Sequence, residues 1–211
     1  FPLNGLQGQA EGFGNVGSHT ARIMHEIGAR VVAVSDVTGG LYNKNGLDIP
    51  KLLAASKDKG RSLRETKLGD WITNEDLLQL DCTVLVPAAL SEQITAKNAA
   101  KVRCKILAEG ANGPTTLEAD EILHDKGIFI IPDILANSGG VIVSYFEWVQ
   151  DVQRFFWKEQ DIRDRLQEII TSAFHRTLDF STKQKASMRM AALMSGIDQV
   201  AKAHLVRGLY P

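Results

Sequence analysis

The chain has 211 residues, of which 44% are hydrophobic and 23% are charged, so it holds enough apolar material for a sizeable buried core. Its formal net charge of −1 supplies no broad cationic field, which disfavours nucleic acid and anionic membranes as partners. No apolar run reaches the roughly 18 residues of a membrane span, and the first residues lack the pattern of a signal peptide. We expect a cytoplasmic protein, and the missing initiator Met suggests a piece of a longer chain.

The two cysteines carry no recognisable metal or redox motif. Cys82 and Cys104 each stand at the start of an apolar run, outside any CxxC or Cys/His cluster. We predict buried free thiols in a reducing compartment, with a single disulfide as the alternative. No metal site is expected.

The first two thirds of the chain alternate β-like runs with helical patterns, as parallel strands with crossover helices do. Strands are predicted at 30–35, 82–86, 105–108 and 128–131. Helices are predicted at 16–27, 48–59, 94–101 and 117–126. The fold class is therefore α/β, with a doubly wound, mostly parallel sheet of about five or six strands.

Long helical patterns replace this alternation after Gly139. The segment 141–157 is rich in aromatic residues, and two amphipathic patterns follow, from Ile162 to Phe174 and from Met190 to Ala201. Core packing is the simplest interpretation of their apolar stripes, although exposed stripes would be a solubility liability. We divide the chain into a dinucleotide-binding core, 1–140, and C-terminal helices that complete the domain, 141–211.

A glycine-rich turn, Gly12-Phe13-Gly14-Asn15-Val16-Gly17, opens the first predicted helix. In a βαβ unit such glycines permit a tight turn, close approach of the backbone to a pyrophosphate and close helix packing. The helix that follows presents free N–H groups and its positive dipole end to the phosphates. Asp36 follows the next predicted strand, about 20 residues farther on, where an acid accepts hydrogen bonds from an adenosine ribose; a turn cap is the alternative role.

The segment before this turn does not fit the pattern. A central strand of four to six apolar residues is expected there, but Gly8-Gln9-Ala10-Glu11 is short and polar. Either residues are missing or misassigned, which we favour, or the strand forms irregularly.

Three loops at predicted strand ends form a second group of candidates, because ligands of open α/β sheets bind at the carboxyl ends of strands. They are residues 86–89, 109–116 and 133–140, and each mixes small and amide side chains. Asn112 and Asn137 could bond ribose or carboxamide groups, or simply cap turns and helices.

The order and spacing of these segments resemble the glutamate dehydrogenases. The motifs are GFGNVG, VVAVSD with a following GG, LVPAAL, EGANGPTT, PDILANSGGVIVSYFEW and MRMAA. The resemblance runs from about Gly5 to Pro211 and corresponds to the family's C-terminal, NAD(P)-binding domain. Leucine and phenylalanine dehydrogenases share the glycine turn and Gly139-Gly140-Val141 but differ in the flanking residues.

The resemblance implies oxidative deamination of L-glutamate to 2-oxoglutarate and ammonia, with hydride transfer to NAD(P). By matching motif, the pyrophosphate would be held by Gly12, Gly14, Asn15, Val16 and Gly17. Asp36 would contact the adenosine ribose, and the nicotinamide-ribose side would be lined by Ala88, Asn112 and Asn137. Ser144 would reach the side-chain carboxylate of the substrate, unless its hydroxyl bonds the helix backbone instead.

The family's catalytic lysine and aspartate belong to an N-terminal substrate domain, and no segment here matches them. We therefore predict no catalytic residue in this chain and no catalysis by it alone. Asp36 would repel a 2′-phosphate, which favours NAD over NADP without excluding NADP. The resemblance also implies a homo-oligomer, a hexamer, for the full-length enzyme. The alternatives are a leucine- or phenylalanine-type dehydrogenase and a non-catalytic NAD(P) sensor.

Overall fold

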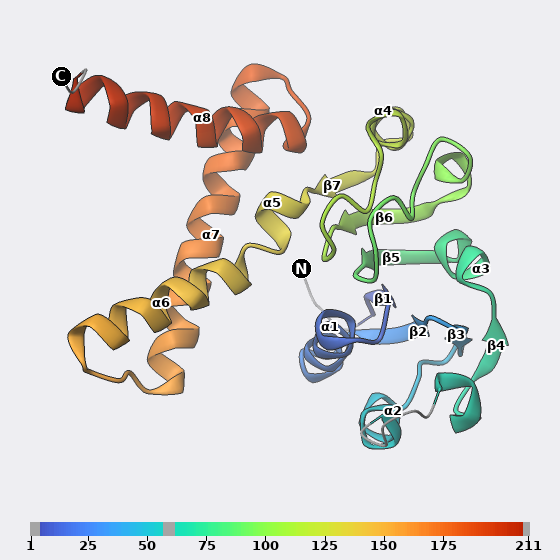
Figure 1. Cartoon of the computed structure of the whole chain (residues 1–211). Helices are drawn as coiled ribbons and strands as arrows, with labels where there is room; N and C mark the ends of the chain where they lie inside the picture. Colours follow the sequence, from blue (N-terminus) through green and yellow to red (C-terminus); the bar gives the residue numbers. More distant parts are fainter. Residues whose placement is uncertain (1–4, 57–61, 209–211) are drawn as a thin grey trace. The chain divides into compact units, whose positions relative to one another are not determined.

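The computed structural model describes residues 5–56 and 62–208 (Figure 1). The chain forms two compact units, residues 1–133 and 134–211, and each unit is described by itself. The change of texture in the sequence places the division slightly later, after residue 140.

The first unit is built on one seven-stranded sheet with the order β4-β3-β2-β1-β5-β6-β7. The strands are β1 (Gln7–Glu11), β2 (Arg30–Asp36), β3 (Gly39–Tyr42), β4 (Asp70–Ile72), β5 (Asp81–Pro87), β6 (Arg103–Ala108) and β7 (Phe129–Ile131). Four neighbouring pairs are parallel, from β2 through β1, β5 and β6 to β7, while β3 and β4 pair antiparallel at one edge. The predicted α/β, mostly parallel, doubly wound sheet is confirmed, with more strands than expected.

Helices cover both faces of this sheet. They are α1 (Asn15–Glu26), α2 (Ile49–Ser56), α3 (Asn74–Gln79) and α4 (Leu117–Asp125), with 3-10 helices at Leu63–Thr66 and Ala99–Lys101. One buried cluster joins α1 and α2 to the sheet through Val34, and another joins α3 and α4 through the preceding residue, Ala33. Because successive strand residues face opposite sides, these two clusters are the two cores of a three-layer unit. The predicted helix at 48–59 corresponds to α2, and its residues 57–59 lie outside the described residues.

The central strand β1 corrects the sequence-based expectation of missing or misassigned residues. The polar segment itself forms the strand, parallel to β2 on one side and β5 on the other, with a register shift between Gly8 and Gln9. Glycine suits position 8 because α1 packs closely there: a Cβ would lie 2.6 Å from Sδ of Met24. On the other face, Gln9 and Glu11 are 0% and 2% exposed. The strand has small residues on the face toward α1 and buried polar residues on the other face. A search for runs of apolar residues therefore does not detect it.

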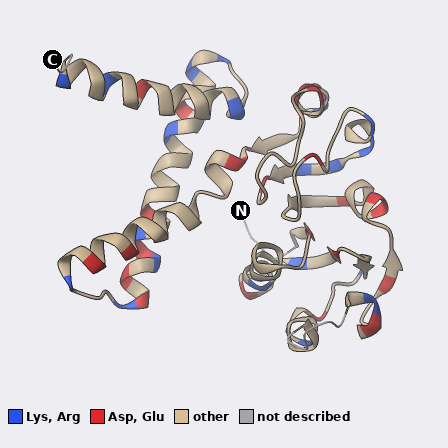
Figure 2. Cartoon of the chain, in the orientation of Figure 1, with Lys and Arg blue, Asp and Glu red and all other residues tan. Residues whose placement is uncertain are grey.

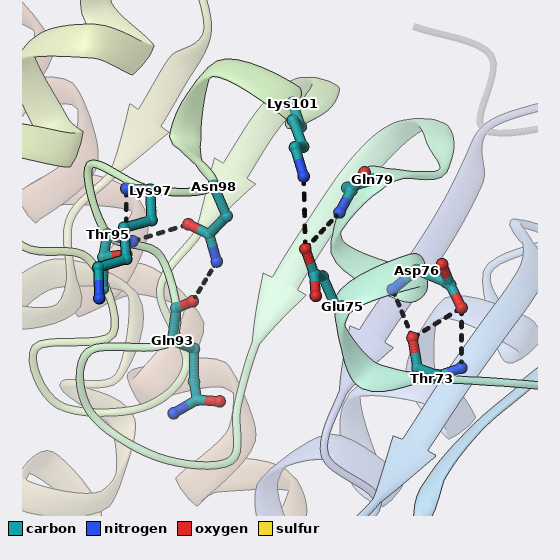
Figure 3. Close-up of polar contacts among 9 residues, drawn as sticks. All are labelled: Thr73, Glu75, Asp76, Gln79, Gln93, Thr95, Lys97, Asn98 and Lys101. Carbon is teal, nitrogen blue, oxygen red and sulfur yellow. Dashed lines mark hydrogen bonds and ion pairs between the residues drawn. The ribbon is translucent and has the colours of Figure 1, made fainter.

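The predicted helix at 94–101 is wrong except for its last turn, the 3-10 helix Ala99–Lys101. The Asn98 side chain accepts from the Thr95 N–H at 2.8 Å and donates to the Gln93 carbonyl at 2.8 Å (Figure 3). Such local side-chain bonds offer the backbone an alternative to helix. Ile94 also pairs with Thr115 as an isolated parallel bridge, which fixes extended backbone at that position.

Sequence reasoning missed the antiparallel edge. β3 returns from β2 through a two-residue turn, so that Asp36 faces Gly39 across the hairpin. Val37-Thr38 is not a typical hairpin turn sequence, since two-residue turns favour Asn-Gly or Asp-Gly. The short helix α3 was missed as well; its capping box, in which Thr73 and Asp76 bond each other's backbone, is drawn in Figure 3.

Both cysteines are free and buried, as predicted. They face each other on the neighbouring strands β5 and β6. Burial raises the pKa of the Cys82 thiol far above its usual range and that of Cys104 to about 11. The thiols are therefore protonated and unreactive at neutral pH.

The second unit consists of helices: α5 (Asp133–Ala136) leads into α6 (Gly139–Gln153), α7 (Glu159–Gln184) and α8 (Met188–Arg207). The three predicted long helices are confirmed, and both signs of charge are distributed along α7 (Figure 2). The aromatic helix ends at Gln153 rather than 157, because Arg154 adopts a left-handed conformation, φ 52°. The Gln150 side chain then accepts from the Trp157 N–H at 2.7 Å.

The expectation that the apolar stripes of these helices are core is wrong for many of their residues. Phe146 is buried against the Trp157 ring, at 5.5 Å between ring centroids. In contrast Trp148 is 60% exposed, and α8 exposes Leu193, Ile197 and Val200. These α8 side chains line an open apolar groove of about 610 Å³ within the second unit.

Candidate functional site

The candidate site lies at the carboxyl edge of the sheet, where β1 and β5 are neighbours. From β1 the chain runs outward to β2, β3 and β4, and it then returns to the other side of β1 as β5. The loops after β1 and β5 therefore diverge in opposite directions, which is the point at which open α/β sheets bind ligands. The glycine turn follows β1, and Ala88 follows β5.

Two glycines of the turn are required by close packing. Gly12 has a positive φ of 98°, and a Cβ there would lie 3.0 Å from the Ala89 nitrogen. A Cβ on Gly17 would lie only 1.8 Å from the Gly12 carbonyl oxygen. The Gly12 N–H donates to the buried Ser35 hydroxyl at 3.1 Å, which ties the turn to β2. The turn thus packs against the loop after β5 and is bonded to β2.

Gly14 differs, because a Cβ there would meet nothing within 4 Å. It is the N-cap of α1, and neither a capping side chain nor an acidic residue occupies the first turn of that helix. Asn15 and Val16 are exposed. The start of α1, at the positive end of the helix dipole, is thus exposed and uncapped, and such a helix end is suited to a phosphate.

Asp36 has local partners that the sequence did not reveal. Its Oδ1 accepts from the Thr38 N–H at 2.8 Å and from the Thr38 hydroxyl at 2.6 Å. Its Oδ2 accepts from the Leu63 N–H at 2.7 Å. The carboxylate thus orders the β2–β3 turn, which is the alternative role considered for it. A carboxylate has about four lone-pair sites, so acceptor capacity remains for ribose hydroxyls, and the ribose role stays a prediction.

The loops after β5 and β6 meet the glycine turn. The Ala88 N–H donates to the Glu11 carbonyl at 2.7 Å. A Cβ on Gly110 would lie 3.2 Å from Cβ of Ala88 and 3.3 Å from Cγ1 of Val16. The three predicted segments at residues 12–17, 88–89 and 110 therefore converge, although they are distant in sequence.

Asn112 is exposed on the loop after β6, and two carboxylates brace this loop. The Gly113 N–H donates to Oδ2 of Asp133 at 2.8 Å, and the Asp133 N–H donates to Oε2 of Glu109 at 2.9 Å. Glu109 is fully buried. The loop that presents Asn112 is therefore pinned to the end of β7.

The remaining two predicted residues belong to the second unit. Asn137 is half-buried after α5, and Ser144 is exposed on α6. The Ser144 hydroxyl bonds none of the described residues, so the back-bonded alternative is not observed. The structure thus brings together Gly12, Gly14, Asn15, Val16, Gly17 and Ala88, and it places Asn137 and Ser144 in a separate unit.

No role was predicted from sequence for the acids that follow or end the strands, namely Glu11, Glu109 and Asp133, although the last two open the candidate loops 109–116 and 133–140. Their common signal is an acidic residue directly after a short apolar or small-residue run, at positions where a solvated loop would otherwise begin. Among residues 5–56 and 62–208, no group of three or more His, Cys, Asp or Glu side chains is placed to hold a metal ion. No helix in the same ranges has the length and apolarity needed to cross a membrane.

Comparison with known proteins agrees with this geometry. The model of the glutamate/leucine/phenylalanine/valine dehydrogenase family matches residues 2–208. The chain is 48% identical over 198 residues to the catabolic NAD-specific glutamate dehydrogenase RocG of Bacillus subtilis, covering 94% of the chain and 46% of that protein. It is 50% identical over 202 residues to a glutamate dehydrogenase of Thermotoga maritima, covering 95% of the chain and 48% of that protein.

Among solved structures, the hetero-hexameric glutamate dehydrogenase of Thermus thermophilus superposes with a TM-score of 0.90 at 32% identity, covering 99% of the chain and 49% of that structure's chain. The chain thus spans about half the length of the curated relatives it matches. The match over nearly all of its residues establishes the family. The chain belongs to the glutamate/leucine/phenylalanine/valine dehydrogenases.

Proposed function

We propose that this chain is the coenzyme-binding part of an enzyme that oxidatively deaminates L-glutamate to 2-oxoglutarate and ammonia, with hydride transfer to NAD. The observation that carries the proposal is the glycine turn at the β1–β5 junction, with Gly14 open and Gly12 and Gly17 closed by packing. The names of the relatives support NAD and glutamate. NADP stays a second candidate coenzyme.

The proposed roles follow the geometry. The pyrophosphate would be held by the backbone of Gly12, Gly14, Asn15, Val16 and Gly17. Asp36 would accept from the adenosine ribose with its remaining lone pairs. Ala88, Asn112 and Asn137 would line the nicotinamide-ribose side, and Ser144 would donate to the substrate's side-chain carboxylate. When bound, the nicotinamide would accept the hydride. The residues named here would orient the coenzyme and the substrate for that transfer.

The catalytic lysine and aspartate would belong to an N-terminal substrate domain of the longer protein. We propose that the exposed apolar side chains of the second unit contact this N-terminal domain, because so many exposed apolar side chains are rare on a separate protein. We further propose a cytoplasmic homo-oligomer, a hexamer. The hetero-hexameric relative supports six subunits, while their being identical rests on the family resemblance; the two free thiols suit a reducing compartment.

The test is turnover by the full-length protein with NAD⁺ and with NADP⁺, using glutamate, leucine and phenylalanine as substrates. We expect the highest kcat/KM with glutamate and NAD⁺. A higher kcat/KM with leucine or phenylalanine would favour the alternative substrate class within the family. Coenzyme binding without turnover of any amino acid would instead support a nucleotide sensor.

A further inference from the structure

Glu11 is a buried acid at the centre of the sheet's carboxyl edge. It is the last residue of β1, lies opposite Pro87 of β5 and is 2% exposed. Its backbone carbonyl accepts from the Ala88 N–H at 2.7 Å, and Oε2 of its side chain accepts from the Ala89 N–H at 3.4 Å. One residue therefore holds two successive amides of the loop after β5.

The amides that Glu11 holds belong to the segment on which the glycine turn rests. A Cβ on Gly12 would lie 3.0 Å from the Ala89 nitrogen and 3.1 Å from the Ala88 carbonyl carbon. On its other side, Ala88 is packed against Gly110. A shift of a few tenths of an ångström in this segment would therefore move two walls of the site.

We propose that Glu11 is a positioning residue of the coenzyme site: its carboxyl group holds the Ala89 amide beside the glycine turn, and its charge makes dinucleotide affinity depend on pH. The inference rests on the proposed function, because it concerns the same site. It deepens that function by assigning a regulating group within β1.

The electrostatics set the direction of the pH effect. Burial raises the pKa of Glu11 above 4.5, while its bonds with the Ala89 and Ala88 amides oppose this by lowering the pKa. A dinucleotide brings two negative phosphate charges to the adjacent turn, which disfavours an ionised Glu11 and raises its pKa further. Binding must then take up a proton, so affinity falls as pH rises through the pKa of Glu11.

Other ionisable groups lie on the elements packed against β1. They are Arg30 and Asp36 on β2, Asp81 and Cys82 on β5, Glu75 and Asp76 on α3, and His19, Arg22, His25 and Glu26 on α1. Several are engaged elsewhere: Asp36 with Thr38, Glu75 with Lys101, Asp76 with Thr73, and Arg22 with Glu26. The causes of the Glu11 shift are burial and backbone amides, so the charge of Glu11 is separable from theirs.

Two substitutions separate the two parts of the role. Glu11→Gln keeps an oxygen for the Ala89 N–H but carries no charge, so we expect affinity at low pH to be preserved and its dependence on Glu11 ionisation to vanish. Glu11→Met has a similar length but no acceptor, and we expect it to bind about fivefold more weakly than Glu11→Gln at every pH, the effect of one lost hydrogen bond. Glu26→Gln, an exposed acid on α1, is the matched control and should behave as the unsubstituted protein.

The experiment is an NADH fluorescence titration of the full-length protein from pH 5 to 9, with melting curves to confirm that each variant is folded. We expect the ratio of the unsubstituted Kd to the Glu11→Gln Kd to rise with pH, by at most tenfold per unit, and then to level off. A constant ratio overturns the proposal, even if Glu11→Met does not fold. Absence of NADH binding by the unsubstituted protein at any pH would overturn the proposed function as well.

Discussion

Gly17→Ala is expected to destabilise the protein by about 3 kcal/mol or more, at the upper end of the usual cost of overpacking. Helix propensity alone predicts the opposite sign, since Ala in a helix interior is favoured over Gly by roughly 0.5–1 kcal/mol. Steric overlap outweighs helix propensity here, because the new Cβ would lie 1.8 Å from the Gly12 carbonyl oxygen, a backbone atom of the adjoining tight turn. Urea denaturation followed by circular dichroism measures the change.

Gly14→Ala and Gly196→Ala are the matched controls. Gly14 has ordinary φ, −75°, and open space around it, so its substitution should cost less than about 1 kcal/mol of stability yet weaken coenzyme binding strongly. Gly196 lies within α8 with nothing near its would-be Cβ, and Ala there should stabilise. Equal stability of the Gly17→Ala and Gly196→Ala proteins would contradict the geometry described for the turn.

Gln9→Met is expected to stabilise the protein by about 1–3 kcal/mol, the cost of a buried amide without partners. Gln9 is fully buried at the centre of β1, beside Ala33 of β2 and Leu85 of β5. Neither its Oε1 nor its Nε2 has a hydrogen-bond partner among the described residues. Met is nearly isosteric with Gln, so the substitution removes two unsatisfied polar atoms without changing the packing volume.

The control for this prediction is Gln7→Met, on the same strand but only half-buried. Its effect should stay within about 0.5 kcal/mol, as for most surface changes. Thermal and chemical unfolding of both variants measures the difference. If Gln9→Met instead lowered the midpoint of unfolding, the Gln9 amide must have hydrogen-bond partners in solution. Gln9 would then not be an unsatisfied polar residue in an apolar layer.

The elements with strong periodicity were predictable from sequence because a single local pattern specifies them. The predicted ends of helix α1 and of strands β2, β5 and β6 lie within two residues of the observed ends. β1 was only the disfavoured alternative, an irregular strand, because its burial comes from pairing with β2 and β5 on both sides, which no local pattern records. The hairpin after Asp36 was missed for a related reason: an Asp side chain, not a Gly-containing turn, orders it.

The candidate site was predictable as a set of residue types but not as an arrangement. The glycine turn and the loops after β5 and β6 were recognised one by one, and the β1–β5 junction places them together. The carboxylates that brace those loops were missed, because Glu11, Glu109 and Asp133 bond backbone amides of neighbouring loops that are distant in sequence. The order of the strands in the sheet is what brings each carboxylate next to the backbone amide that it accepts from.

We propose above all that the glycine turn of this 211-residue chain binds a dinucleotide. The decisive experiment is calorimetric titration of the folded chain and of its Gly14→Ala variant with NADH. We expect saturable binding of one NADH per chain, strongly weakened in the variant while the melting temperature is nearly unchanged. A folded chain that shows no saturable heat with either NADH or NADPH would contradict it.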